Sequence, residues 1–319
     1  MTDSKSQPDI KIFALNSNME LAEKISAAVG IPLGKSTVKK FSDDEIKISV
    51  DESIRGDEVY VIQSVSDPVN TNLMELLIMV DALRRASAGS INVVIPYYGY
   101  SRADRKARSR EPITAKLIAT FFQMDGVDRV VTLDLHADQI QGFFDIPVDH
   151  LRAARLLANF FESKHGAEDV VVVSPDHTGV SRARTFAELL NAPIAIIDNR
   201  SPEDANTIPE SVIGDVKGKR AVVVDDLIDT GIKLEIASET LKKAGASEVF
   251  AMATHPIFSG DAVSRLKNSQ IEKVIVTDSI KVSEKNQFDK LEIVSVDKLF
   301  GEAIKLIHNQ QSVGKLFGR

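Results

Sequence analysis

Short runs of β-branched residues alternate with segments of helical spacing along most of the chain. Buried strands are indicated by INVVIPYY, DRVVTLDLH, DVVVVSP and KRAVVVDD. Helical spacing separates such strands, as in PITAKLIATFFQMDG and GIKLEIASETLKKAG. Continuous apolar strands separated by helices are typical of parallel sheets that helices cover on both faces. The sequence therefore predicts an α/β fold built from such sheets.

The chain has 319 residues, a length that suggests about two domains, each with its own core. The same alternation of predicted strands and helices occurs once in each half, which indicates an ancient duplication. We predict an N-terminal domain over residues 1–153 and a C-terminal domain over residues 154–296. Residues 297–319 form a last helix and a tail, which the pattern alone assigns to neither half.

The composition excludes several classes of protein. A formal net charge of −7 argues against general nucleic-acid binding. The chain has no cysteine, which excludes disulfides and thiolate metal sites and fits a cytoplasmic protein. No apolar run reaches the roughly 18 residues of a membrane span, and the start MTDSKSQPD lacks the apolar core of a signal peptide. We expect a cytoplasmic protein that binds neither membrane nor nucleic acid.

A strongly basic segment, SRADRKARSREPITAK, follows the strand INVVIPYY. In parallel α/β sheets, ligands bind in the crevice at the carboxyl ends of the strands. Clustered cations at such a place in an acidic protein indicate a site for a polyphosphate. A solvent-exposed basic loop without a ligand is the alternative.

Polar side chains end three other strands. His136 follows DRVVTLDL, Asp176 follows DVVVVSP, and Asp225 and Asp226 follow KRAVVV. Mg²⁺ takes oxygen ligands and usually shares them with substrate phosphates, so these carboxylates suit a site for a metal and a nucleotide. A structural histidine and carboxylates that cap the following helices are the alternative interpretation.

The most specific signal is DDLIDTG, residues 225–231. It places Asp229 and Thr230 at the start of the next helix, where backbone N–H groups and the helix dipole hold phosphate well. The preceding acidic pair cannot bind phosphate, but it can accept hydrogen bonds from sugar hydroxyls or hold a cation. The stretch therefore predicts a site for a sugar phosphate.

Over nearly its whole length the chain resembles the ribose-phosphate diphosphokinases, also called phosphoribosyl diphosphate synthetases. The resemblance rests on FSDDEI, PYYGYSRADRK, GVDRVVTLDLHADQIQGFFDIPVD, VVVDDLIDTG and ATHPIFSG. It implies two phosphoribosyltransferase-like domains per subunit, a last helix that returns to the N-terminal domain, and a homo-oligomer that is typically a hexamer. It also implies transfer of the β,γ-diphosphoryl group of Mg-ATP to the anomeric hydroxyl of ribose 5-phosphate, with release of AMP.

The resemblance assigns roles to the matching residues, with ATP as substrate and Mg²⁺ as cofactor. It implies adenine contacts across a subunit interface for Phe41, Asp43 and Glu45, and nucleotide contacts for Arg102 and Asp104. It implies metal and triphosphate contacts for His136 and Asp176, and catalytic roles for His136 and Arg200. It implies ribose 5-phosphate contacts for Asp225, Asp226, Asp229, Thr230 and Gly231.

Four departures from the family pattern fall where catalysis and ribose phosphate binding are implied. Asn199 and Ser201 stand in place of a lysine and an arginine of the catalytic loop. Ile232 and Lys233 stand where the ribose phosphate loop of the family ends in Gly-Thr. Because phosphoryl transfer depends on positioning and on cations aimed at the developing charge, we expect impaired turnover. Lys233 brings a cation that could itself bind phosphate as a point charge.

Two milder departures, Ala103 for a glutamine and Asp44 for a glycine, fall in the nucleotide segments. All these changes lie in ligand loops, whereas the long matching segments form core and oligomer surfaces in the family. A second hypothesis is therefore a catalytically silent paralogue that forms a mixed oligomer with an intact synthetase and regulates it. A phosphoribosyltransferase that consumes the product is a weaker alternative, because the paired domains and the nucleotide scaffold resemble the synthetase.

Overall fold

The computed structural model describes residues 8–198 and 211–317. Internal contacts divide the chain into two compact units. The first unit comprises Met1–Arg152 with Val296–Arg319, and the second comprises Ala153–Ser295. The last helix thus belongs to the same unit as the first half of the chain, and each unit is described by itself below.

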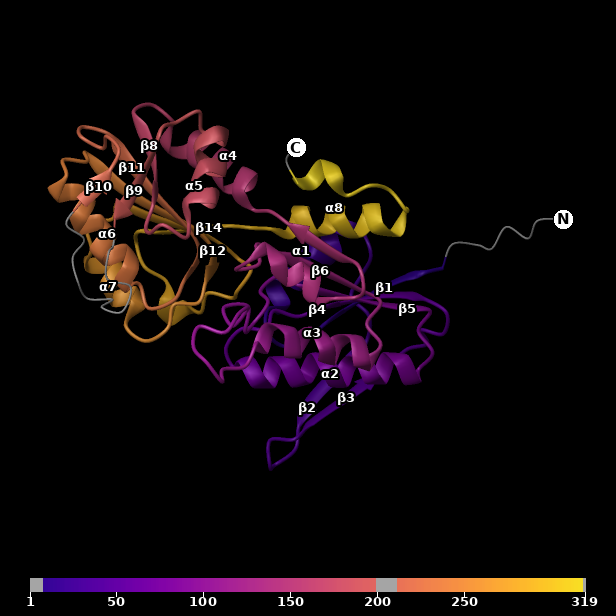
Figure 1. The fold of residues 1–319 in the computed structure, drawn as a ribbon. Helices are drawn as coiled ribbons and strands as arrows, with labels where there is room; N and C mark the ends of the chain where they lie inside the picture. Colours follow the sequence, from indigo (N-terminus) through magenta and orange to yellow (C-terminus); the bar gives the residue numbers. More distant parts are fainter. Residues whose placement is uncertain (1–7, 199–210, 318–319) are drawn as a thin grey trace. The chain divides into compact units, whose positions relative to one another are not determined.

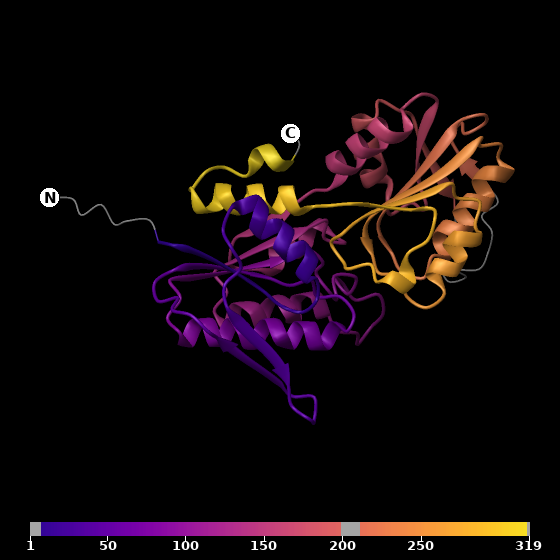
Figure 2. The same ribbon diagram turned by 180° about the vertical axis from the view of Figure 1, so that it is seen from behind.

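A five-stranded sheet forms the centre of the first unit (Figure 1). All its strand pairs are parallel. Its order is β1 (Ile10–Ala14), β4 (Glu58–Ile62), β5 (Ser90–Ile95), β6 (Arg129–Leu133) and β7 (Val148–Leu151). Figures 1 and 2 show helices α2 (Val69–Arg85) and α3 (Thr114–Asp125) on one face, and α1 (Met19–Val29) with α8 (Asp297–His308) on the other.

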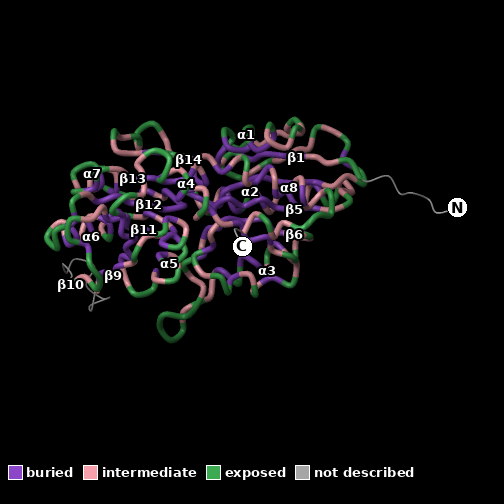
Figure 3. Tube along the Cα trace, turned by 90° about the horizontal axis from the view of Figure 1, so that it is seen from above, coloured by how far each residue is buried: buried purple, intermediate pink, exposed green. Residues whose placement is uncertain are grey.

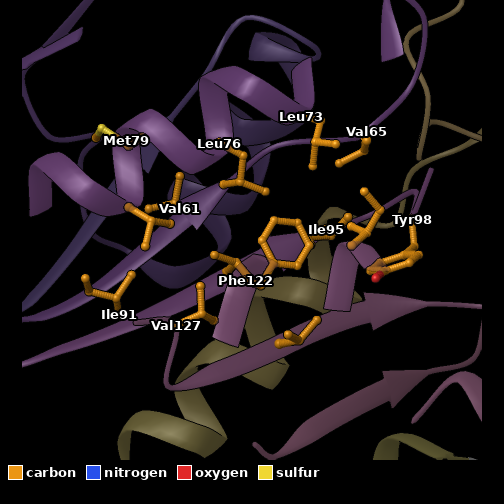
Figure 4. Packing of buried hydrophobic residues seen from close by; sticks show 14 of the residues in the cluster. Val61, Val65, Leu73, Leu76, Met79, Ile91, Ile95, Tyr98, Phe122 and Val127 are labelled. Carbon is orange, nitrogen blue, oxygen red and sulfur yellow. The ribbon is translucent and has the colours of Figure 1, made fainter. Parts of the chain in front are cut away.

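The core of the first unit lies between this sheet and helices α2 and α3. Figure 4 shows Phe122 packed among Val61, Leu76 and Ile95. The ring of Tyr98 meets that of Phe122 edge to face, with 6.3 Å between centroids. Such packing holds the carboxyl ends of β4 and β5 firmly, because protein interiors are close-packed and resist small displacements.

A hairpin of β2 (Ser36–Lys40) and β3 (Ile46–Val50) projects beyond α2 (Figure 1). Alternation of apolar and polar residues predicted the half-exposed strand at 45–51, and β3 confirms it. Its partner β2 was not predicted, because STVKK carries a single large apolar residue. The hairpin places the turn Phe41–Glu45 at its tip, where Asp44 adopts the left-handed conformation with φ 69°.

A seven-stranded sheet forms the centre of the second unit. Its order is β10 (Ser211–Ile213), β9 (Ile194–Asp198), β8 (Val170–Ser174), β11 (Arg220–Ile228), β12 (Glu248–Pro256), β13 (Lys273–Thr277) and β14 (Leu291–Val294). Every pair is parallel except β10 with β9. The apolar run of β11, residues 221–224, is fully buried in the middle of the sheet (Figure 3).

Helices cover this second sheet on both faces. One face carries α4 (Ala154–His165) and α5 (Val180–Leu189), and the other carries α6 (Ile232–Lys243) and α7 (Ala262–Asn268) (Figures 1 and 2). Together with the first unit, this arrangement confirms the predicted class of α/β fold with parallel sheets. Along the described ranges, the helices all fall short of the length and hydropathy needed to cross a bilayer.

The last helix, α8, is fixed to the first unit by close packing and by a hydrogen bond. Gly301 faces α1 so closely that a side chain there would approach Ala28 Cβ to 2.7 Å. His308 Nδ1 lies 2.7 Å from Glu58 Oε2 at the start of β4. These contacts hold α8 against α1 and β4 within the first unit.

Candidate active site

In both units, the residues predicted to contact metal, triphosphate or ribose phosphate lie at or after the carboxyl ends of parallel strands, the edge at which α/β sheets bind ligands. In the first unit, the loop after β5 carries Arg102 and Asp104, and the segment after β6 carries His136. Asp104 Oδ2 accepts a hydrogen bond of 2.7 Å from Gln139 Nε2, in the 3-10 helix Asp138–Phe143. The structure therefore brings Asp104 next to the segment that presents His136.

The chain around His136 is held by two residues that were not predicted from the sequence. The backbone N–H of Leu135 donates to Nε2 of the buried His150, at 2.7 Å. Arg152 donates to Asp138 Oδ1 at 2.8 Å and lies 3.9 Å from Asp134 Oδ1. His150 lies in β7 and Arg152 directly follows it. Their role therefore becomes visible only from the parallel pairing of β6 with β7. The imidazole of His136 itself is exposed.

Arg102 and the other cations of the basic loop also lie at the surface. Hydrogen bonds within the loop order it, because Glu111 Oε2 accepts from the backbone N–H groups of Ala107 and Arg108. Ala103 is fixed at both backbone groups, by a bond from its N–H to Tyr100 O and a bond to its carbonyl from Ala115 N. An ordered loop of exposed cations after a buried strand can bind a polyphosphate.

The predicted adenine residues lie at the tip of the β2–β3 hairpin. Phe41 is 53% exposed, and the Lys47 ammonium lies 5.9 Å from its ring centroid. The Asp43 carboxylate accepts a hydrogen bond from Glu45 N at 3.3 Å, which stiffens the turn. Asp44 takes the left-handed backbone that glycine adopts more readily. The tip presents a large exposed ring on a projecting element, a geometry suited to contact with another molecule.

In the second unit, Asp225 and Asp226 lie in β11 near its carboxyl end. Arg182 from α5 bridges the pair, since its Nη1 lies 3.2 Å from Asp225 Oδ1 and 3.4 Å from Asp226 Oδ1. Asp225 Oδ1 also accepts the backbone N–H of Asp226 at 2.9 Å. Arg182 was not predicted as a site residue, because its place on a helix before β9 gives no sign that it faces β11.

Asp176 lies in the loop after β8, the strand next to β11. Its Oδ1 accepts hydrogen bonds from Thr178 N, Thr178 Oγ1 and Gly179 N, at 2.6–3.1 Å. Its Oδ2 lies 3.0 Å from Lys233 Nζ, and the same ammonium lies 3.1 Å from Asp225 Oδ2. Lys233 thus sits between two carboxylates that come from different strands.

These contacts shift the ionisation of all three groups. Burial opposes ionisation of Asp176, but the Lys233 ammonium and the hydrogen bonds of Thr178 and Gly179 lower its pKa to about 2. Burial raises the pKa of Asp225 to about 6, since the nearby Asp226 adds to it and Lys233 and Arg182 only partly offset it. Burial opposes the charge of Lys233, yet the two carboxylates raise its pKa above the usual range. Lys233 is therefore a cation at neutral pH.

The predicted phosphate turn has the expected form at the start of α6. Gly231 is the N-cap residue of α6 and has φ 76°. Ile232 is the first helical residue, so the left-handed conformation of the turn falls on Gly231 and not on the branched side chain. Asp229 and Thr230 lie between the end of β11 and this helix. The turn can thus offer backbone N–H groups to a phosphate.

The carboxylates of the second unit do not fit a divalent cation as they stand. Mg²⁺ requires about six oxygen ligands in near-octahedral geometry. The Asp176 and Asp225 oxygens instead face Lys233, Arg182 or N–H donors. Across residues 8–198 and 211–317 no group of three or more His, Cys, Asp or Glu side chains forms a metal cluster. Of the two predicted metal ligands, His136 belongs to the first unit and Asp176 to the second.

Three residues of the predicted catalytic loop, Asn199, Arg200 and Ser201, lie outside the described residues. Their roles remain expectations from the sequence.

Comparison with known proteins gives matches along the whole chain. The family model for the N-terminal domain of ribose phosphate pyrophosphokinase matches residues 10–126. The model for the phosphoribosyl synthetase-associated domain matches residues 202–318. A protein of Lactiplantibacillus plantarum, named provisionally as ribose-phosphate pyrophosphokinase 2, is 63% identical over 317 residues, which cover 99% of each chain. The ribose-phosphate pyrophosphokinase of Listeria ivanovii is 56% identical, over 99% of this chain and 100% of that one.

A solved structure is similar over almost the same length. The crystal structure of phosphoribosylpyrophosphate synthetase from Mycobacterium smegmatis superposes with a TM-score of 0.90 at 40% sequence identity. The superposition covers 95% of this chain and 99% of that one.

Proposed function

Since this chain belongs to the ribose-phosphate pyrophosphokinase family, we propose that it binds Mg-ATP and ribose 5-phosphate and transfers the diphosphoryl group between them with impaired turnover. The products are phosphoribosyl diphosphate and AMP. The observation that carries the proposal is the DDLIDTG turn, which joins an acidic strand end to the N-terminus of α6. The impaired rate follows from the residues that surround this turn and from those of the catalytic loop.

The first unit supplies the nucleotide site. Exposed cations after β5, with Arg102 foremost, are suited to the triphosphate of Mg-ATP, and Mg²⁺ enters as part of that substrate. Asp104 accepts a hydrogen bond from Gln139, three residues after the exposed His136, so Asp104 and His136 are suited to one edge of the site. Phe41, Asp43 and Glu45 would serve the adenine of a neighbouring subunit in a homo-oligomer, of which a hexamer is the expected form.

The second unit supplies the ribose 5-phosphate site. The phosphate binds to backbone N–H groups at Thr230, Gly231 and the first turn of α6, where the helix dipole favours an anion. Asp225 and Asp226 are the acceptors suited to the ribose hydroxyls, and at Asp225 the sugar competes with the Lys233 ammonium, which lies 3.1 Å from Oδ2. Because Arg182 holds both carboxylates in place, their positions are set before the sugar arrives.

Turnover is impaired because cations needed for the transition state are absent from the sequence. Asn199 and Ser201 replace a lysine and an arginine, and loss of one preorganised donor typically costs about 2.7–4 kcal/mol. Arg200 remains as one cation of that loop. The two losses need not add, because residues that act as a unit are strongly non-additive.

The alternative is a catalytically silent chain that assembles with an intact synthetase in a cytoplasmic mixed oligomer. The departures support it, because they fall in ligand loops while relatives match over 99% of the chain. Such a chain would regulate its partner only by interacting differently with the partner's active and inactive states. Phe41 at the exposed hairpin tip is the residue suited to that contact.

One assay separates the two functions. The purified chain alone is incubated with Mg-ATP, and AMP is measured with and without ribose 5-phosphate. We expect slow AMP formation that depends on the sugar phosphate, below the range of about 1–100 s⁻¹ that is usual for kinases. A rate within that range would contradict impairment. Sugar-independent AMP or none at all would favour the silent chain, which native mass spectrometry of a co-expressed pair then tests.

We expect nucleotide binding to survive better than catalysis, and Ala103→Gln to strengthen it. The backbone of Ala103 is already held at both ends, so the added amide changes only the side chain. One hydrogen bond is worth about 0.5–1.5 kcal/mol, which corresponds to a roughly 2- to 12-fold lower Kd for Mg-ATP. Ala107→Gln, on the exposed part of the same loop, is the control and should leave the calorimetric Kd unchanged.

A further inference from the structure

Lys233 reaches from the first turn of α6 to two carboxylates of neighbouring strand ends. Its ammonium lies 3.0 Å from Asp176 Oδ2 and 3.1 Å from Asp225 Oδ2. The two acids belong to the loop after β8 and to β11, so no single loop brings them together. A cation between two carboxylates from separate strands occupies the place that a bound metal ion would take in an acidic strand-end site.

The remaining oxygens of both carboxylates are also engaged. Asp176 Oδ1 accepts from Thr178 and Gly179. Asp225 Oδ1 faces Arg182 and the backbone N–H of Asp226. With Lys233 on the other oxygens, both carboxylates have positive or N–H partners on each side. A divalent cation would have to displace the ammonium and then meet its charge at close range, which is electrostatically unfavourable.

We infer that Lys233 is a tethered replacement for a divalent cation, and that it closes the Asp176–Asp225 pair to Mg²⁺ and to the sugar hydroxyls of ribose 5-phosphate. The inference deepens the proposed function, because the sugar part rests on ribose 5-phosphate being the ligand of this unit. The sequence suggested that Lys233 could bind phosphate as a point charge. In the structure its ammonium instead faces the carboxylates.

The lysine side chain is not part of the apolar core. It is 53% exposed, whereas the next residue, Leu234, is buried in the core of the second unit. Its removal should therefore leave the fold intact and release two carboxylates. Arg182 would still hold Asp225, so the released site would carry more negative charge without losing its shape.

The test compares Lys233→Thr with Lys243→Thr, a change of an exposed lysine near the end of the same helix. Mn²⁺ binding is counted by electron paramagnetic resonance on the full chain without nucleotide, and melting is followed with and without Mn²⁺. We expect Lys233→Thr to bind one more Mn²⁺ per chain than the parent, and its Tm to rise with Mn²⁺ by mass action. Lys243→Thr should match the parent in both measurements.

Two further variants keep the result interpretable. Lys233→Met removes the charge at nearly the same length, so it should gain the same ion if charge is what excludes the metal. Lys233→Thr combined with Asp176→Asn should lose the gained ion. Equal Mn²⁺ counts and equal melting responses in parent and Lys233→Thr, with a native circular dichroism spectrum, would overturn the inference.

A calorimetric titration with ribose 5-phosphate in Mg²⁺ separates this inference from the proposed function. Tighter binding by at least tenfold in Lys233→Thr supports both. A gained Mn²⁺ without any binding of ribose 5-phosphate supports the replacement of a cation but contradicts the proposed sugar ligand. Tighter binding of ribose 5-phosphate without a gained Mn²⁺ contradicts the inference that Lys233 replaces a divalent cation. It still supports ribose 5-phosphate as the ligand.

Discussion

Restoring four positions together is expected to raise turnover by at least about 10²-fold, with Ile232→Gly, Lys233→Thr, Asn199→Lys and Ser201→Arg in one chain. The first two changes return the ribose phosphate turn to the family pattern and free Asp176 and Asp225 from the ammonium. The last two return cations to the catalytic loop. AMP formed from Mg-ATP in the presence of ribose 5-phosphate measures the result.

The two pairs of changes should act on different steps. Ile232→Gly with Lys233→Thr alone should tighten ribose 5-phosphate binding and leave the maximal rate low. Asn199→Lys with Ser201→Arg alone should raise the rate only at very high sugar phosphate. This separation is expected because interactions made equally with ground and transition states change KM, whereas donors aimed at developing charge change kcat.

Each pair therefore serves as a control for the other. If the four changes bind ribose 5-phosphate normally but leave turnover at the parent value, the cations of the catalytic loop are not what limits the rate. If the turn pair alone restores full turnover, the impairment resides in Ile232 and Lys233 and not in that loop. The same mass as the parent assembly in every variant, checked by native mass spectrometry, is required for either conclusion.

The strand ends were predictable from the sequence because their pattern is local. The apolar run 221–224 followed by DD identified both the buried strand β11 and its acidic end. The turn was predictable for the same reason, and the structure puts its left-handed residue on Gly231. Ile232 is the first residue of α6, so the left-handed conformation of the turn does not fall on its branched side chain.

Interactions between distant segments were not predictable. Lys233 was identified by comparison with a motif, yet its contact with Asp176 lies 57 positions away along the chain and depends on the order of β8 and β11. Sequence spacing carries no information on strand order, so His150 and Arg182 escaped notice for the same reason.

Arg182→Met is expected to destabilise the second unit by about 3 kcal/mol at pH 8. Removing one partner of a buried ion pair typically costs about 3–5 kcal/mol, because a buried charge is left uncompensated. The low end applies here, since the Arg182 side chain is 26% exposed and Lys233 still faces Asp225. Urea midpoints measure the loss without screening the charges as guanidinium would. Arg184→Met, at an exposed position of the same helix, should change the midpoint little.

The destabilisation caused by Arg182→Met should depend on pH, because Asp225 titrates with a raised pKa. Asp225 already has a pKa of about 6 in the folded chain, against about 3.9 in an unfolded one. An acid whose pKa is raised by folding destabilises the fold once it ionises, and this penalty vanishes below the unfolded pKa. Without Arg182 the pKa of Asp225 in the folded chain rises further, so ionisation of Asp225 destabilises the variant more than the parent at pH values above about 6.

The difference in the free energy of unfolding between parent and Arg182→Met should therefore shrink steadily from pH 8 to pH 5. A difference that is constant over this range would mean that lost packing of the arginine, and not the exposed charge of Asp225 and Asp226, causes the destabilisation.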